Sequence, residues 1–378
     1  MEESATIAMS RKSRELKAQG KDVISLSLGE PDFNTPQFIK DAATEAMDNN
    51  FTKYMPVPGY DDLRESISNK FKRDNNLNYD KDQIVVSTGA KQSIANVVLT
   101  LINPGDEVII PAPFWVSYIE IVKVAGGIPI LVNAGIDKDF KIDGKDLENA
   151  ITAKTKLMIF STPCNPTGSV YNRSELRDLA DVIKKHPSLI VLCDEIYEHI
   201  NFESKHESLA QFNDVYGQVV TVNGVSKAWA MTGWRLGWSF WPKHLVEHVN
   251  KLLINSVSCV NAAAQFAGIA ALDGPDDSID HMMVKFTERR NLIHKGLNDL
   301  PGVECSLPGG AFYAFPKVIG TGMNGSEFAK KAMHEAGVAI VPGTAFGKTC
   351  QDYVRFSFAA SQDNISQALE NIKKMLTK

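Results

Sequence analysis

Short apolar runs separated by amphipathic stretches dominate the chain from about residue 83 to residue 240. Runs of this kind are typical of strands buried on both faces, and several of the stretches between them have helical periodicity. The alternation therefore predicts a mostly parallel sheet with helices on both faces. We expect seven strands, at residues 83–87, 106–111, 128–132, 156–160, 189–193, 219–223 and 235–240.

The rhythm changes after residue 240, where two long helical patterns precede several short strands and a last helix from about Asp363. A chain of 378 residues favours one large and one smaller domain. We predict an α/β fold in which residues 41–280 form a large domain around the sheet, and residues 1–40 with 281–378 form a small α+β domain. Further helices are expected at 38–47, after a capped start at Asn34-Thr35-Pro36, and at 60–73, 91–101, 242–253 and 281–297; the short strands are expected at 310–315, 338–342 and 353–358.

Composition and charge narrow the classes of function. Forty basic against 45 acidic side chains give a net charge of -5, so the chain has no general attraction for nucleic acid or anionic membranes. Five cysteines without a CxxC pair indicate neither a disulfide framework nor a thiolate metal site. The N-terminal residues do not resemble a signal peptide, and no apolar run is long enough for a membrane span. We expect a cytoplasmic protein that binds small molecules.

Reactive side chains follow three of the predicted strands. Asn165 comes after the fourth apolar run, Asp194 and Tyr197 after the fifth, and Lys227 after the sixth. Ligands of open parallel sheets bind at the carboxyl ends of the strands, so these groups should meet at one edge. The sequence therefore places an amide, a carboxylate with a phenol, and a lysine in one candidate site.

These residue types suit a cofactor that carries a carbonyl, a pyridine ring and a phosphate. A partly desolvated lysine such as Lys227 can form an imine with a carbonyl compound. A buried Asp194 would keep a pyridine nitrogen protonated and make the ring an electron sink. Gly89 and Ala90, between a strand and a helix, offer backbone amides to a phosphate, and Arg235 adds a guanidinium fork.

Seven motifs in order carry a resemblance to a known family: GEPDF, KYMPVPGYDDLRE, PFWVSY, NPTG, DEIYE, SKAWAMTGWRLG and YVRFSFA. Together they resemble the class I aminotransferases of fold type I, across nearly the whole chain. The similarity is greatest to the bacterial aspartate aminotransferase branch. It implies that the cofactor is pyridoxal 5'-phosphate.

The resemblance implies a role for each site residue. Lys227 would hold the cofactor as a Schiff base and later act as general base, and Asp194 would pair with the pyridinium nitrogen. Tyr197 and Asn165 would bond the ring oxygen, and Trp115 would stack on the ring. The phosphate would be held by Gly89, Ala90, Ser226 and Arg235, together with Tyr54 from the second subunit of a homodimer. Lys91 is also expected among the residues that bind the cofactor.

The same resemblance implies how a substrate binds. Arg355 would take the α-carboxylate through two parallel hydrogen bonds, helped by Gly29, Asn165 and Trp115. Lys91 would recognise a distal carboxylate, which favours dicarboxylic substrates. Without the resemblance, the alternation of its strand makes Arg355 a solvated residue.

The expected reaction moves the α-amino group of L-aspartate to 2-oxoglutarate by a ping-pong mechanism. Other substrates stay open on the same fold, namely those of an aromatic, alanine or prephenate aminotransferase or a C-S β-lyase. Relatives that use prephenate tend to carry a lysine where this chain has Glu2 and a proline where it has Glu3. This difference makes prephenate a less favoured substrate. A non-catalytic regulator would need a DNA-binding module, for which the chain has no room.

Two other motifs are misleading. Residues 320–325 match GxGxxG, but the strand that follows ends in Pro342-Gly343 instead of an acidic residue, so no dinucleotide site is expected. His244 and His248 have the i, i+4 spacing of metal ligands without a Glu beside the first histidine. We expect no metal site.

Overall fold

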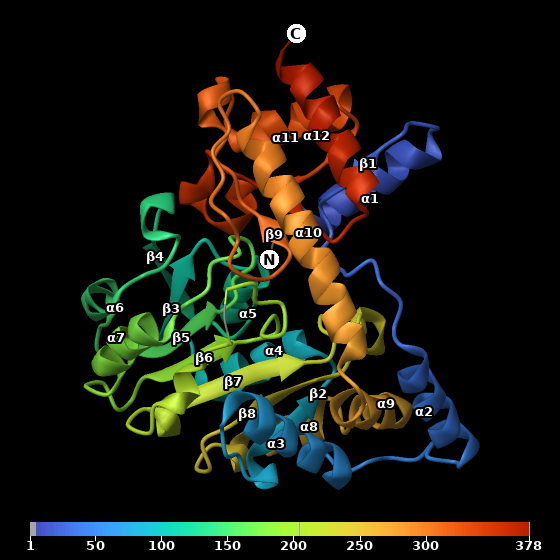
Figure 1. Ribbon diagram of the computed structural model, residues 1–378. Helices are drawn as coiled ribbons and strands as arrows, with labels where there is room; N and C mark the ends of the chain where they lie inside the picture. Colours follow the sequence, from blue (N-terminus) through green and yellow to red (C-terminus); the bar gives the residue numbers. More distant parts are fainter. Residues whose placement is uncertain (1–4, 204, 378) are drawn as a thin grey trace.

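The computed structural model describes residues 5–203 and 205–377. A seven-stranded sheet with the order β2-β8-β7-β6-β5-β3-β4 forms the middle of its lower part (Figure 1). Neighbouring strands are parallel except where β8 runs antiparallel to β2 and β7. The predicted fold class is confirmed. The strands are β2 (Ile84–Ser87), β3 (Glu107–Ala112), β4 (Ile128–Asn133), β5 (Thr155–Ser161), β6 (Ile190–Asp194), β7 (Val219–Gly224) and β8 (Gly237–Phe240).

The sheet separates two hydrophobic cores. In β6, Val191 and Cys193 pack into one core and Leu192 into the other, because successive side chains of a strand point to opposite faces. All three are fully buried, which explains why the strand is continuously apolar.

Helices cover both faces of the sheet, as the sequence predicts. One core contains side chains of α2 (Gln37–Asp48), α3 (Asp61–Asn75), α6 (Gly144–Ala150), α7 (Arg173–Ile183) and α9 (Ala262–Asp273). The opposite core contains side chains of α4 (Ala90–Leu101), α5 (Ser117–Val124) and α8 (Val246–Ser256).

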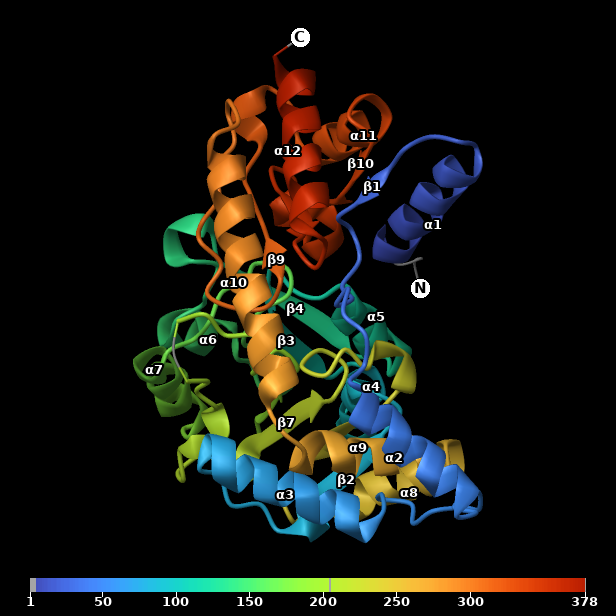
Figure 2. The ribbon, with the colours of Figure 1, turned by 45° about the vertical axis from the view of Figure 1, so that its right-hand side comes forward.

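The start and the end of the chain meet in a second unit. Figure 2 shows α1 (Ala5–Ala18) and β1 (Ile24–Ser25) beside α11 (Gly325–Glu335) and β10 (Val338–Ala339). β1 pairs with β10 in parallel, with Ile24 opposite Val338. A three-stranded sheet with the order β11-β12-β9 completes the unit, together with two helices. These elements are β9 (Tyr313–Ala314), β11 (Val341–Pro342), β12 (Val354–Ser357), α10 (Asp277–Asn298) and α12 (Gln362–Leu376).

Helix α10 connects the two units. Ile279, in its first turn, packs into a core of the seven-stranded sheet, whereas Phe286 and Ile293 pack among the C-terminal elements. The domain boundary predicted at residue 280 therefore falls inside one continuous helix, and the division into 41–280 and the remainder stays a prediction.

The two misleading motifs have structural explanations. In the 320–325 segment, the Asn324 side chain accepts hydrogen bonds from the N–H groups of Ser326 and Glu327 and caps α11. The helix predicted from residue 242 begins only at Val246, so His244 lies outside it and does not share its face with His248. Within the described residues, no helix is both long and apolar enough to cross a membrane.

Candidate active site

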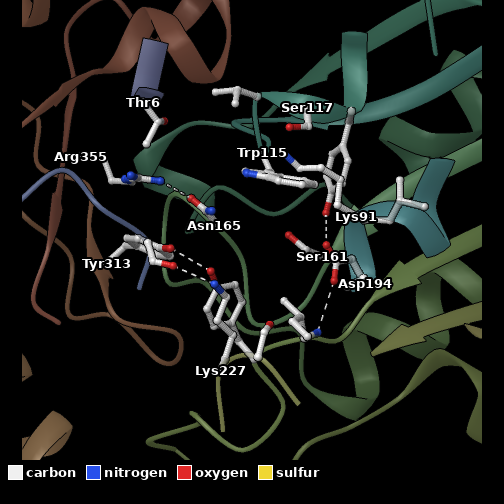
Figure 3. Close-up of a pocket in the computed structure, with 18 of the residues that line it drawn as sticks. Thr6, Lys91, Trp115, Ser117, Ser161, Asn165, Asp194, Lys227, Tyr313 and Arg355 are labelled. Atoms are coloured by element: carbon white, nitrogen blue, oxygen red, sulfur yellow. Dashed lines mark hydrogen bonds between the residues drawn. The ribbon is translucent and has the colours of Figure 1, made fainter. Parts of the chain in front are cut away.

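A pocket of about 300 Å³ lies between the carboxyl edge of the large sheet and the second unit (Figure 3). Asp194 is the last residue of β6, and Asn165 and Lys227 follow β5 and β7, so the predicted meeting of strand ends occurs. The pocket brings together every predicted site residue except Gly89 and Tyr54. These are Gly29, Ala90, Lys91, Trp115, Asn165, Asp194, Tyr197, Ser226, Lys227, Arg235 and Arg355.

Lys227 reaches across the pocket to the loop that follows β1. Its Nζ donates a hydrogen bond of 2.7 Å to the carbonyl oxygen of Gly29. Burial lowers the pKa of Lys227 to about 8, although Glu30 and Asp194 act in the opposite direction. The amine is therefore much easier to deprotonate than an exposed lysine.

Asp194 presents a buried carboxylate to the same pocket. It accepts hydrogen bonds from the Tyr118 hydroxyl at 2.7 Å and from the backbone N–H of Ile196 at 3.3 Å. Burial raises the pKa of Asp194 to about 6, and the Tyr118 bond partly opposes that rise. Both donors are neutral, so the carboxylate would gain from a cationic group beside it.

The opposite side of the pocket is suited to an anion. Helix α4 begins at Ala90 and directs its dipole and free N–H groups toward this side. Gly89 has a φ of +84°, and a Cβ there would lie 2.5 Å from Arg235 Nη2. Arg235 itself is held by the carbonyl of Thr232, at 2.8 Å. Gly89 thus lets the guanidinium approach the start of α4, although it does not line the pocket.

Arg355 is buried, with 1% of its surface exposed, and so differs from the solvated residue that strand alternation suggests. Its two terminal nitrogens donate to Asn165 Oδ1 at 2.9 Å and to the Ser27 carbonyl at 2.6 Å. Lys91 lies elsewhere on the wall, with Nζ 4.9 Å from the centre of the Trp115 ring. Partial burial and the nearby Arg235 lower the pKa of Lys91.

Several lining residues were missed by the sequence analysis. Tyr118 and Tyr313 sit in apolar segments and cannot be told from core residues without the fold. Tyr54 lies outside the pocket with 92% of its surface exposed. Glu2 and Glu3 lie outside the described residues. The other missed lining residues are Thr6, Ile7, Ile94, Val116, Ser117, Ser161 and Ile196.

Behind the pocket wall, a buried charge cluster follows Asp194 in the chain. Glu195, Glu198 and His206 are close enough to hold a metal ion. However, Lys70 already forms an ion pair with Glu198, and His206 lies 3.1 Å from Glu195. The carboxylates are therefore compensated by side chains.

The pocket fits the cofactor that the sequence predicts. A desolvated amine at Lys227 can meet a carbonyl, the buried carboxylate of Asp194 can meet a protonated pyridine, and the start of α4 with Arg235 can hold a phosphate. Fold and pocket together are those of an enzyme that uses pyridoxal 5'-phosphate.

Comparisons with known proteins place the chain more narrowly. The family model for aminotransferase class I and II matches residues 21–372. The aspartate aminotransferase of Bacillus subtilis is 44% identical over 99% of this chain and 96% of its own length. The aspartate/prephenate aminotransferase of Nitrosomonas europaea is 43% identical over 99% and 97%. The crystal structure of the Rhizobium meliloti aspartate aminotransferase superposes with a TM-score of 0.96 at 36% identity, covering 100% of this chain and 97% of that one.

The chain belongs to the class I and II aminotransferases and is a pyridoxal-phosphate-dependent enzyme.

Proposed function

We propose that this aminotransferase acts on dicarboxylic substrates, with L-aspartate as amino donor and 2-oxoglutarate as acceptor. The observation that carries this proposal is the presence of two cationic side chains, Arg355 and Lys91, in the lining of one pocket that also holds Lys227. One cation suits the α-carboxylate, and the other suits a distal carboxylate. The aspartate aminotransferase of Bacillus subtilis, at 44% identity, supports the same choice.

Lys227 is the residue that binds the cofactor carbonyl and then moves the substrate proton. Bound pyridoxal phosphate supplies an electron sink for the electrons released when the substrate Cα–H bond breaks. Lys227 Nζ would take that proton as general base and would then donate it to the carbon that carried the cofactor's carbonyl. Its lowered pKa of about 8 favours this role, because a larger fraction is neutral near physiological pH.

Other residues orient the reacting groups. Asp194 would pair with a protonated ring nitrogen, and Tyr197 and Asn165 would donate hydrogen bonds to the ring oxygen. Asn165 also accepts from Arg355, at 2.9 Å, so one amide links the cofactor side of the pocket to the substrate side. The phosphate is assigned to the start of α4 with Ser226 and Arg235, and the ring face to Trp115.

We further propose a homodimer in the cytoplasm, in which Tyr54 reaches the phosphate of the partner subunit. A tyrosine with 92% of its surface exposed in the single chain favours a position at an interface. Five free cysteines favour a reducing compartment.

A second candidate substrate is prephenate, because relatives such as the enzyme of Nitrosomonas europaea carry the name aspartate/prephenate aminotransferase. Glu2 stands where prephenate-using relatives tend to have a lysine, and this difference in sequence makes aspartate the first choice.

A half-reaction tests the substrate proposal. The purified holoenzyme is mixed with single amino acids while its visible absorbance and the released 2-oxo acid are followed. Aspartate and glutamate should convert the enzyme rapidly, with release of oxaloacetate and 2-oxoglutarate. Reaction with aromatic or neutral amino acids alone would contradict the dicarboxylate assignment. Prephenate, offered to the amino form of the enzyme, tests the second candidate.

Lys91→Gln then tests the distal contact. Loss of one charged hydrogen-bonding partner should lower kcat/KM for aspartate by about 10- to 100-fold and leave alanine within about threefold. Lys251→Gln, on the exposed face of α8, is the matched control and should change neither value. Equal losses for aspartate and alanine would remove Lys91 from the distal site.

A further inference from the structure

Tyr313 connects the two ends of the pocket. It is the first residue of β9, has 1% of its surface exposed and lines the pocket (Figure 3). In the small sheet it pairs with Ser357, two residues after Arg355 on β12. The backbone of one sheet therefore fixes Tyr313 and the Arg355 guanidinium relative to each other.

The hydroxyl of Tyr313 meets the hydroxyl of Tyr197, with 2.8 Å between the oxygens. Tyr197 belongs to the segment after β6, so this contact joins the second unit to the edge of the large sheet. A bond between two phenols needs one donor and one acceptor. When Tyr313 donates, the Tyr197 hydroxyl hydrogen is free to point into the pocket.

The charge of Arg355 favours this direction. Its guanidinium carbon lies 4.4 Å from the centre of the Tyr313 ring, on the ring face. Burial raises the pKa of Tyr313, and the Arg355 cation is the main influence that opposes the rise. Burial also raises the pKa of Tyr197. The cation on the Tyr313 ring, at 4.4 Å, is closer than the Lys227 nitrogen is to the centre of the Tyr197 ring, at 5.9 Å, and this geometry favours Tyr313 as the donor.

The ring of Tyr313 has a second contact surface. While its face carries Arg355, its hydroxyl lies directly over Gly29, where an added Cβ would come within 2.3 Å of the oxygen. The Gly29 backbone can approach only because it has no side chain. Tyr313 thus contacts Tyr197 on one side of the pocket, Arg355 on the other, and the Gly29 loop between them.

We infer that Tyr313 is a positioning residue with two separable functions. Its hydroxyl donates to Tyr197 and thereby aims the Tyr197 hydrogen into the pocket, while its ring holds the Arg355 guanidinium in the orientation that binds a carboxylate. The inference rests on the proposed function, in which Tyr197 faces the cofactor and Arg355 faces the substrate.

Tyr313→Phe tests the hydroxyl alone, because the ring stays. Without the donated bond, Tyr197 becomes a weaker donor toward the cofactor, and the Lys227 nitrogen keeps its proton to a higher pH. The pH midpoint of the holoenzyme's visible absorbance should rise by about 0.5 unit. The Kd for maleate, an unreactive dicarboxylate, should stay within about twofold of wild type.

Tyr313→Leu tests the ring, because it removes the surface beneath Arg355. The Kd for maleate should rise about five- to tenfold, which is the size expected for a buried cation–π contact. Tyr171→Phe is the matched control, since Tyr171 is also buried and its hydroxyl accepts from the Ile142 N–H at 2.9 Å, outside this pocket. It should leave both the midpoint and the Kd unchanged.

Three results would overturn the inference. They are an unshifted midpoint in Tyr313→Phe, the same shift in Tyr171→Phe, and an unchanged maleate Kd in a folded Tyr313→Leu. Failure of the proposed function gives a different signal: the wild-type enzyme would not bind maleate and would react with aromatic or neutral amino acids alone.

Discussion

Asp194 ends β6 with its carboxylate enclosed, and burial raises its pKa to about 6. The folded, cofactor-free chain therefore binds this proton more tightly than the unfolded chain does between about pH 4 and pH 6. The contribution of Asp194 to stability is greatest below pH 4 and is lost as the pH rises through 6. A group placed for chemistry thus destabilises the empty fold at neutral pH.

Asp194→Asn should make the cofactor-free protein more stable at pH 7 by up to about 3 kcal/mol, since the neutral amide removes the cost of a buried charge. The difference from wild type should shrink to near zero at pH 4. Urea denaturation of the two apoproteins across this range measures it, with exposed Asp48→Asn as control. A less stable variant at pH 7 would show that the charge is compensated in the fold.

Single residues also show what the sequence could and could not predict. The sequence places Asn165, Asp194 and Lys227 together because each follows a recognisable apolar strand. The carboxyl ends of parallel strands meet at one edge of the sheet. Tyr118 and Tyr313 were missed because an aromatic residue in an apolar segment has the same pattern whether its hydroxyl faces a pocket or the core. Only the direction of the side chain in the fold separates the two cases.

Side chains from other parts of the chain form hydrogen bonds with several residues of the segment between β1 and α2. Arg355 bonds the Ser27 carbonyl, Lys227 bonds the Gly29 carbonyl, and both terminal nitrogens of Arg289 bond Asp32, at 2.6 and 3.0 Å. The Arg289 guanidinium also lies 5.0 Å from the centre of the Phe33 ring. Of these anchors, the Asp32 pair alone uses no residue of the pocket, so it holds the Gly29 loop independently of the bound molecules.

Asp32→Asn should therefore raise KM for aspartate by about three- to tenfold while leaving the visible spectrum of the holoenzyme unchanged. Steady-state kinetics and absorbance measure the two effects. Arg289→Gln should behave alike, and the double variant should lose no more than either single one, because both remove the same bond. Additive losses would mean that the residues act separately.

At the scale of whole elements, sequence patterns succeeded where amphipathic contrast was strong. Helix α9 was not expected, because small apolar residues such as Ala267 and Gly268 occur on all sides of the helix and leave no polar stripe. The helix packs closely, since a Cβ on Gly268 would lie 2.3 Å from a Leu236 side chain. The predicted cap of α2 was also wrong. Thr35 Oγ1 donates to the Ala230 carbonyl at 2.8 Å, so its hydroxyl serves a tertiary contact and the helix starts without a side-chain cap.

At the scale of the whole molecule, Tyr54 is a predicted site residue that lies exposed on the surface of the single chain, outside the pocket. A homodimer would explain this, because a twofold axis brings the same exposed residue of each subunit to the other subunit's pocket. In such an assembly, two different defects can complement each other.

Tyr54→Ala and Lys227→Ala should each lose most activity as homodimers. Unfolding and refolding an equal mixture should restore about a quarter of wild-type activity, because half of the dimers are hybrids and each hybrid has one intact site. Light scattering reports the dimer, and activity after mixing reports the shared site. Failure of the mixture to regain activity, with dimers present, would place Tyr54 outside the partner's site.

Within residues 5–203 and 205–377, the backbone passes between the two units twice, through residues 26–36 and through α10. The two connections define a hinge axis. Rotation of one unit relative to the other about this axis is the movement that the backbone resists least. Arg355 belongs to the C-terminal unit, and Lys227 belongs to the unit built around the seven-stranded sheet. A molecule that contacts both side chains would bridge the two units, so its binding would favour the rotation that brings these side chains closer together.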